Sequence, residues 1–207
     1  MATNNAVLTP AKQELTPKNF SHLIGMEGFS ERMLTLHFQL YEAYVKNTNL
    51  LLKKWEEFRS KGDFTDPAFA ELKRRFGWEY NSVKLHENYF GAIGKEKSDI
   101  ADTSFKETVS EQFGSFDKWK EEFLGVASAR GVGWAVLYRD PSNQKLINCW
   151  IDEHNNGHLI QSEPILVLDV FEHAFLIDYG VDRKKYLTAF MNNVQWDKVE
   201  IRLTGGK

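Results

Sequence analysis

The sequence predicts an α+β protein in which a long helical hairpin precedes a domain with a small three-stranded antiparallel sheet. Two observations support this class. Apolar residues recur at helical spacing over residues 30–90, and three short β-rich runs follow residue 130. Helices that come first and strands that come later are typical of α+β chains. We expect an N-terminal α-hairpin domain over residues 1–95, with a polar arm over residues 1–18, and a C-terminal α+β domain over residues 96–207.

The first long helix is predicted to begin at Ser30, because a serine hydroxyl suits the N-cap position. It runs to Phe58 and stops at Gly62, since glycine readily adopts the left-handed conformation that closes many helices. A second helix is predicted to begin at Asp66, a capping residue followed directly by proline, and to continue to Phe90. Two long helices joined by a short turn form an αα-hairpin. The apolar residues that carry the pattern of the first helix are Met33, Leu36, Leu40, Tyr44, Leu50 and Leu51.

The predicted sheet comes from three segments of the second half. WAVLYRD and KLINCWID are rich in β-forming residues and are separated by PSNQ, which has the composition of a turn, so they predict a β-hairpin. EPILVLDV is the third predicted strand. The remaining segments predict helices: DTSFKETVSEQFG, then SFDKWKEEFLGVASAR with Ser115 or Asp117 near its cap, and finally DRKKYLTAFMNNV.

Composition narrows the possible partners and compartment. The chain has 207 residues and a formal charge of −3, which gives no global attraction to nucleic acid or anionic lipid. Cys149 is the only cysteine, so a reducing compartment is expected. Residues 1–18 lack the apolar core of a signal peptide, and no run reaches the length of a membrane span. We therefore expect a cytoplasmic protein with neither nucleic acid nor a membrane as partner.

The segment VLDVFEHAF places charged residues inside an apolar run. Asp169 and His173 are costly to bury unless they are paired or face a cation. His37 and His86 occupy the two long helices, which a hairpin brings face to face. Any single histidine here is more often an ordinary hydrogen-bonded core residue, and no short zinc-type signature is present. Three imidazoles and one carboxylate are nevertheless a suitable ligand set for a divalent first-row metal.

The same segment carries a resemblance to a known family. DVFEHAF is similar to the DVWEHAYY signature of the iron/manganese superoxide dismutases. Further blocks resemble that family in the same order, among them HFQLYEAYVKNTN, LHENYF, the segment ending in GVGWAVL, and RKKYLTAFMNNVQWDKVEIRL. The resemblance covers about residues 19–203. It implies an oxidoreductase that converts superoxide to oxygen and hydrogen peroxide with one iron or manganese ion per subunit.

The resemblance also implies roles for individual residues. His37, His86, Asp169 and His173 would bind the metal, with a solvent molecule as the fifth ligand. Tyr44 would stand at the mouth of the substrate channel, and Arg183 would line the entry funnel. Glu172 would reach the partner subunit's His173 in a homodimer, although a tetramer remains open. The aromatic wall around the metal would consist of Trp134, Tyr89, Phe90 and Phe171.

Three differences from the family pattern bear on the site. His37 and Tyr44 are seven residues apart rather than eight, which we interpret as a straight helix without the π-bulge that one extra residue requires. The glutamine that bonds the metal-bound solvent has no match, and either His154 or His158 could replace it. Val167 stands where iron enzymes tend to carry threonine and manganese enzymes glycine, and its size favours iron.

Two other functions remain open on the sequence alone. One is a structural or assembly protein that inherited the dismutase fold, although such proteins typically lose ligands and all four candidates are present here. The other is a metal protein with a different redox activity, because a ligand set does not determine the reduction potential.

Overall fold

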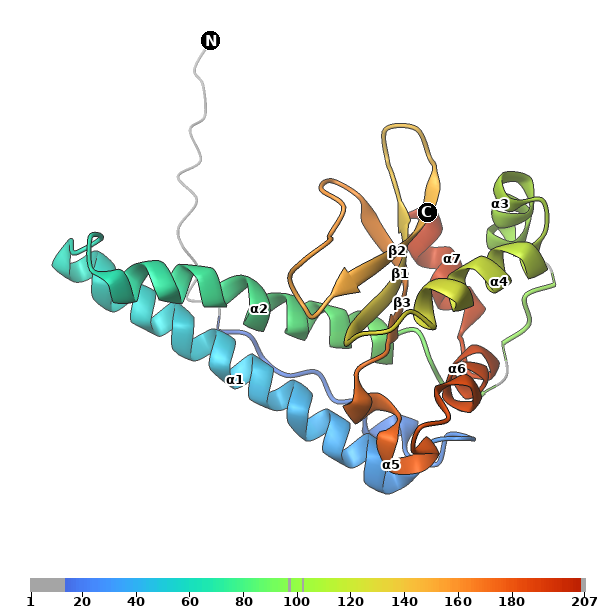
Figure 1. Cartoon of the computed structure of the whole chain (residues 1–207), viewed down its shortest axis with the longest axis horizontal. Coiled ribbons are helices and arrows are strands. Elements are labelled where there is room, and N and C mark those ends of the chain that lie inside the picture. The colour runs from blue at the N-terminus through green and yellow to red at the C-terminus, as the bar shows by residue number, and fades with distance from the viewer. Residues whose placement is uncertain (1–13, 97, 102, 206–207) are drawn as a thin grey trace, which may run out of the picture.

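The N-terminal half is a long helical hairpin made by α1 (Glu31–Lys61) and α2 (Pro67–Phe90). Figure 1 shows this hairpin in the computed structural model, which describes residues 14–96, 98–101 and 103–205. The tip of the hairpin points away from the sheet. Residues 1–13 of the predicted polar arm lie outside the described residues. Leu15, within the rest of the arm, bonds through its backbone N–H and C=O to the side-chain amide of Asn49 on α1.

Local signals set the ends of both long helices as predicted. The Ser30 hydroxyl accepts a hydrogen bond from the backbone N–H of Met33 and caps α1. Gly62 ends the helix with φ of 69°, in the left-handed region that favours glycine. Asp66 caps α2 by accepting from the N–H of Ala68, because the proline between them has no N–H to give. The predicted hairpin is confirmed, and α1 extends three residues beyond the expected end at Phe58.

The buried face of α1 differs from the apolar pattern in the sequence. Leu36 and Leu50, which carry that pattern, have exposed fractions of 44% and 53%. The inner side of α1 includes polar and aromatic residues instead. Which side is buried depends on the residues of α2 and of the C-terminal half that pack against it. The buried residues of α1 are Met33, Leu34, His37, Tyr41, Val45, Thr48 and Leu51.

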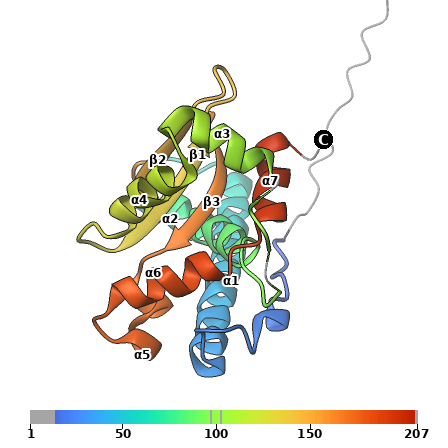
Figure 2. The same ribbon diagram turned by 90° about the vertical axis from the view of Figure 1, so that its right-hand side faces the viewer.

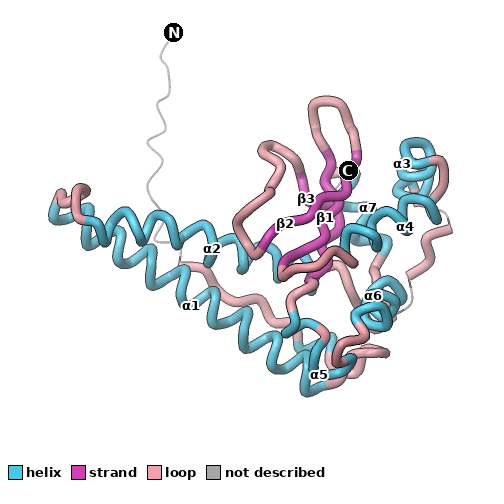
Figure 3. The backbone as a smooth tube through the Cα atoms, in the orientation of Figure 1, coloured by secondary structure: helices cyan, strands magenta, loops and turns pink. Residues whose placement is uncertain are grey.

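The sheet has the predicted three antiparallel strands. β1 (Gly133–Arg139) lies in the middle, between β2 (Leu146–Asp152) and β3 (Glu163–Asp169). The three strands are magenta in Figure 3. The register pairs Trp134 of β1 with Asp169, the last residue of β3. This pairing carries an aromatic side chain and a carboxylate to the same end of the sheet.

Shorter helices surround the sheet. α3 (Ser104–Phe113) and α4 (Phe116–Ala127) match two predicted helices, and Ser115 caps the second by accepting from the N–H of Lys118. α6 (Arg183–Asn192) also matches its prediction. Four short elements were not predicted from the sequence: η1 (Ser21–Leu23), η2 (Glu172–Ala174), α5 (Leu176–Tyr179) and α7 (Trp196–Thr204).

The sheet separates two layers of helices, which places its buried end against the hairpin. α4 packs on β1 and β2, whereas α2 packs on β3; Figure 2 shows the sheet between them. The α+β class is therefore confirmed, while the division at residue 95 remains a prediction. None of the helices in the described part of the chain is both long and apolar enough to cross a membrane.

Candidate metal centre

Four side chains from distant parts of the chain meet where the hairpin covers the end of the sheet. His37 comes from α1, His86 from α2, Asp169 from the end of β3, and His173 from the turn η2. One potential ligand atom of each lies within 4.8 Å of those of the other three. The Nε2 atoms of His37 and His173 both lie 3.1 Å from Asp169 Oδ2, and His86 Nε2 lies 3.7 Å from the same oxygen.

His86 shows that the cluster suits a cation. Its Nδ1–H donates to the carbonyl of Ser82, one helical turn earlier, over 2.7 Å. The neutral ring then carries a lone pair on Nε2, and this buried atom has no hydrogen-bond partner among the described residues. A buried lone pair without a donor costs free energy, and a metal ion would satisfy it. Imidazole nitrogens and a carboxylate oxygen are ligands that iron, manganese and similar ions accept.

The electrostatics of the cluster keep its ligands in metal-binding form. Burial lowers the pKa of His37, and it lowers the pKa of His86 well below the ordinary value, so both rings stay neutral. Burial alone would raise the pKa of Asp169, but the charges and hydrogen bonds of His173 and His37 outweigh it and hold that pKa below its usual range. Neutral histidines and an ionised carboxylate are the forms in which these residues bind metals.

The local structure after β3 explains how VLDVFEHAF presents two of these groups. The backbone N–H of Phe171 donates to Asp169 Oδ1 over 2.9 Å and so turns Oδ2 towards the histidines. The Tyr186 hydroxyl donates to the carbonyl of Asp169 over 2.6 Å and anchors the strand end. The turn η2 then brings His173, four residues later, back to Asp169. Side-chain exposure is 1% or less for His37, His86 and Asp169, but 25% for His173, where the cluster approaches the surface.

Aromatic rings enclose the cluster, as the family resemblance implies. The His37 ring contacts Tyr89 and Phe90 with centroids 5.4 and 4.8 Å away. Trp134 meets His86 edge to face at 4.9 Å, and Phe171 stacks on His173 at 5.1 Å. These apolar faces leave water little room beside the ligands, which strengthens electrostatic interactions within the site.

Tyr44 and His154 form a second, adjoining group. Because α1 continues as an α-helix from Glu31 to Lys61, Tyr44 lies seven residues after His37 with no π-bulge between them, as interpreted from the sequence. The Tyr44 hydroxyl lies 3.1 Å from His154 Nε2, and Trp134 Nε1–H donates to His154 Nδ1 over 3.1 Å. Burial, with smaller contributions from Asp169 and Glu79, raises the pKa of Tyr44 to about 12, and burial lowers that of His154 to about 4.

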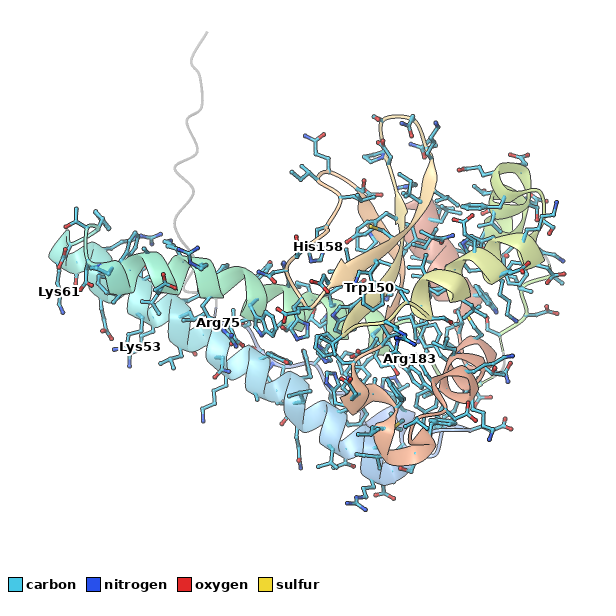
Figure 4. All side chains as sticks on the ribbon, in the orientation of Figure 1. Lys53, Lys61, Arg75, Trp150, His158 and Arg183 are labelled. Atoms are coloured by element: carbon cyan, nitrogen blue, oxygen red, sulfur yellow. The ribbon has the colours of Figure 1, made fainter. Side chains whose placement is uncertain are left out.

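The structure separates the two histidines that the sequence left open. His154 is fully buried beside Tyr44, whereas His158, labelled in Figure 4, is only partly buried. His158 Nε2–H donates to the carbonyl of His154 over 2.9 Å, and its Nδ1 accepts from the Tyr138 hydroxyl over 2.9 Å. His158 therefore supports the loop that carries His154.

Arg183 is not part of the four-residue cluster. Its guanidinium donates to the carbonyls of Ala129 and Gly131 and lies over the Phe175 ring, 5.2 Å from its centroid. In Figure 4 it stands between the sheet and α6. It lines a surface pocket together with Arg130, Lys184 and Glu172, so this residue and the predicted interface residue Glu172 share one surface.

Several residues that hold the site were not found by sequence reasoning. Ser82 contributes through its backbone carbonyl, which orients His86. Tyr186 anchors the end of β3, and Tyr138 holds His158. Tyrosines in apolar segments look like ordinary core residues, and a backbone carbonyl leaves no trace in a sequence. Only the structure could reveal these contacts.

Comparisons with known proteins show the family to which the chain belongs. The family described as "Iron/manganese superoxide dismutases, C-terminal domain" matches residues 101–202. The chain is 34% identical over 190 residues to "Superoxide dismutase [Mn] 2" of Haloferax volcanii, covering 91% of this chain and 94% of that protein. It is also 34% identical over 206 residues to "Superoxide dismutase [Fe]" of Pyrobaculum aerophilum, covering 95% and 94%. At this identity over almost the whole length, and with the resemblance in its motifs now matched by its fold, the chain belongs to the iron/manganese superoxide dismutase family.

Proposed function

We propose that this protein is a superoxide dismutase whose metal is held by His37, His86, Asp169 and His173. The observation that carries the proposal is the convergence of four ligand atoms, three of them on buried residues and one of those the unpartnered Nε2 of His86, in a member of this family. When bound, iron or manganese supplies the change between +3 and +2 that oxidises one superoxide and reduces another. Retention of all four ligand types argues against a purely structural descendant of the fold.

The other residues act on water, protons and the substrate anion. The aromatic rings exclude bulk water from the ligands, and Asp169 is held as an anion by its neighbours. The Tyr44 hydroxyl and His154 Nε2 share a hydrogen beside the cluster, so they can hold a proton close to the place where peroxide needs one. We propose that Arg183, with Arg130 and Lys184, adds positive charge where the superoxide anion approaches.

Iron is proposed as the preferred ion. Val167 is fully buried in β3, two residues before Asp169, and therefore faces the same side of the sheet. Its size supports iron, whereas the named relatives include both iron and manganese enzymes. We further propose a reducing, cytoplasmic compartment, which the single Cys149 supports.

A homodimer is proposed through Glu172 and His173. Glu172 is exposed directly beside the partly exposed His173. Two large apolar residues a few positions further along the chain are exposed as well: Leu176 and Ile177 have exposed fractions of 51% and 42%. Large apolar side chains exposed close to a charged residue support an interface between protein chains at this place. Analytical ultracentrifugation of the wild type and Glu172→Ala tests it: a monomeric wild type would contradict the proposal, and we expect Glu172→Ala to shift the equilibrium towards monomer.

The function is tested with metal analysis and activity together. Protein purified natively is analysed for bound iron, manganese and zinc, and separate iron-loaded and manganese-loaded samples are assayed for dismutation. We expect about one ion per chain and higher activity with iron. A fully loaded but inactive protein would contradict the dismutase function and favour another redox activity. A metal-free protein bound to an assembly partner would favour the structural function.

A further inference from the structure

The candidate metal centre is closed to a hydrated ion in this structure. The side chains of His37, His86 and Asp169 are exposed by 1% or less, so an ion that reaches all four ligands needs a local opening of the fold. His37 is the ligand that such an opening frees most easily. Its helix α1 packs chiefly on α2 and also on η2, whereas α2 packs on the sheet as well, through β3.

Residues 14–20 form a strap that passes from α1 to α2 without regular secondary structure. They belong to the blue stretch of chain beside the hairpin in Figure 1. At the outer end of the strap, the backbone N–H and C=O of Leu15 bond to the side-chain amide of Asn49 on α1, each over 2.8 Å. At its inner end the buried ring of Phe20 contacts Phe90 on α2, with centroids 4.9 Å apart. Separate contacts therefore fasten the strap at both ends.

Tyr41 of α1 joins the strap to both helices. Its hydroxyl accepts a hydrogen bond from the backbone N–H of Lys18 over 2.9 Å and donates to Glu87 Oε1 on α2 over 3.2 Å. Lys18 Nζ lies 3.0 Å from Glu87 Oε2, which closes a ring of contacts between the strap, α1 and α2. Tyr41 is fully buried and the Glu87 side chain is only 11% exposed, so water weakens these bonds little.

This ring of contacts lies at the level of two candidate ligands. Tyr41 is one helical turn after His37 on α1. Glu87 directly follows His86 on α2, and the rings of Tyr41 and His86 have centroids 6.3 Å apart. The two histidines can separate only if α1 and α2 part at this level. That movement breaks the bond between Tyr41 and Glu87 and pulls the strap away from one of the helices.

We propose that Tyr41 is a positioning residue that fastens the strap across α1 and α2, holds His37 at the cluster and thereby sets the rate at which the metal exchanges. The inference rests on the proposed function for the ion that is bound, and on the contacts of the strap for the closure of the hairpin. Because the strap is held by separate bonds rather than by a helix or a sheet, it can detach while the core stays folded.

The rate of metal release tests this role. The full-length protein is loaded with manganese and mixed with excess EDTA, and the metal content is measured in samples desalted at intervals. Tyr41→Phe keeps the ring but loses both hydrogen bonds of the hydroxyl. We expect it to release manganese about tenfold faster than the wild type, the factor expected when one hydrogen bond to a carboxylate no longer holds the closed state. Equal release rates in the two proteins would overturn the inference.

Two further variants separate the strap from general stability. Asn49→Ala removes the outer fastening, about three helical turns beyond His37, and should also speed release. Trp119→Phe is the control, because Trp119 is fully buried and its Nε1–H bonds to Asn148 on β2, away from the strap. It should release manganese at the wild-type rate even where its free energy of unfolding falls. Equal acceleration in all three variants would show general loosening of the fold and contradict the role of the strap.

Hydrogen exchange of the metal-free chain keeps this inference apart from the proposed function. Mass spectrometry of peptides reports the opening of α1 in the full-length protein without any ion. In Tyr41→Phe we expect the amides of residues 34–45 to exchange faster than in the wild type, and those of β1 to stay unchanged. A chain that binds no ion would contradict the proposed function, while the exchange would still decide the strap: unchanged exchange in α1 overturns it.

Discussion

The two ends of the helical hairpin have the same secondary structure but are stabilised in different ways. At the inner end, Val83, Tyr89 and Phe90 are fully buried, and α2 packs against β3. At the tip, none of residues 52–78 is buried. There the helices contact each other through aromatic pairs such as Trp55 with Phe76 and Phe58 with Phe69, with centroids 4.3 and 5.6 Å apart.

The two ends of the hairpin meet different requirements: the inner end has to position candidate metal ligands, whereas the tip does not. The inner end must hold His37 and His86 at one point, so it is surrounded by the rest of the protein. The tip holds no candidate ligand and has solvent on several sides. Substitutions at the inner end should therefore change metal binding and global stability together, whereas substitutions at the tip should change only local stability.

The largest expected effect is that of His86→Ala at the inner end. It removes one ligand and leaves a gap beside Asp169, so we expect loss of bound metal and of all measurable dismutation. The measurements are metal content per chain and superoxide consumption. Phe64→Ser at the tip, where the side chain is 54% exposed, is the control and should retain both. A His86→Ala protein with full metal content would contradict the ligand assignment.

A pair of identical substitutions compares packing at the two ends. Phe90→Ala should lower the free energy of unfolding by about 3–5 kcal/mol, the usual cost of deleting a fully buried phenylalanine ring. Phe69→Ala at the tip should cost about 1 kcal/mol, because its ring is only partly buried. Denaturant unfolding of the metal-free chain measures both. Similar losses at the two positions would show that the tip is as well packed as the inner end.

Acid should destabilise the metal-free chain through the inner end. The pKa values of His37 and His86 are lowered in the folded state, so the unfolded chain binds more protons as the pH falls below the ordinary value of 6.5. Stability is therefore full above pH 6.5 and falls below it, by up to about 1.4 kcal/mol per pH unit for each histidine. His154, with a pKa of about 4, adds to this slope between pH 6.5 and 4.

Denaturant midpoints at several pH values check this slope. His154→Gln should make stability less dependent on pH in that window. Stability that is constant between pH 7 and 5 would contradict the neutral, buried state of these histidines.

The smallest effect is expected from Lys73→Gln at the tip. The Lys73 ammonium lies 3.2 Å from the centroid of the Trp55 ring. An exposed cation–π contact contributes about 0.5–1 kcal/mol, so the free energy of unfolding should fall by about that amount. Metal content and activity should stay at wild-type values. A loss of activity would show that the tip is coupled to the metal centre.

Local signals in the sequence predicted the ends of the hairpin, whereas the buried face required the structure. Ser30, Gly62 and Asp66 act on their own neighbours, so their effects can be predicted without a partner. Leu36 and Leu50 fit a helical face but lie exposed, because burial depends on what packs against the helix. α7 was missed because it is short and begins at Trp196 without a side-chain cap.

The candidate site also has residues that could be predicted from the sequence and residues that required the structure. Residue types and the family resemblance pointed to His37, His86, Asp169 and His173, and the structure brings them together. The choice between His154 and His158 could not be made from the sequence, since the two residues are only four positions apart in the same loop. The path of that loop depends on distant groups, among them Tyr138 and the Cys149 thiol that contacts the Gly157 carbonyl.

The separation of the cluster residues along the chain has a consequence for biosynthesis. His37 and Asp169 are 132 residues apart. At about 5–20 residues per second, a ribosome adds Asp169 on the order of ten seconds after His37. Once His86 has also been added, the nascent hairpin carries two histidines without their carboxylate. The complete set of donors therefore exists only near the end of synthesis. Selection between competing cellular metals by all four ligands can then occur only in the nearly finished chain.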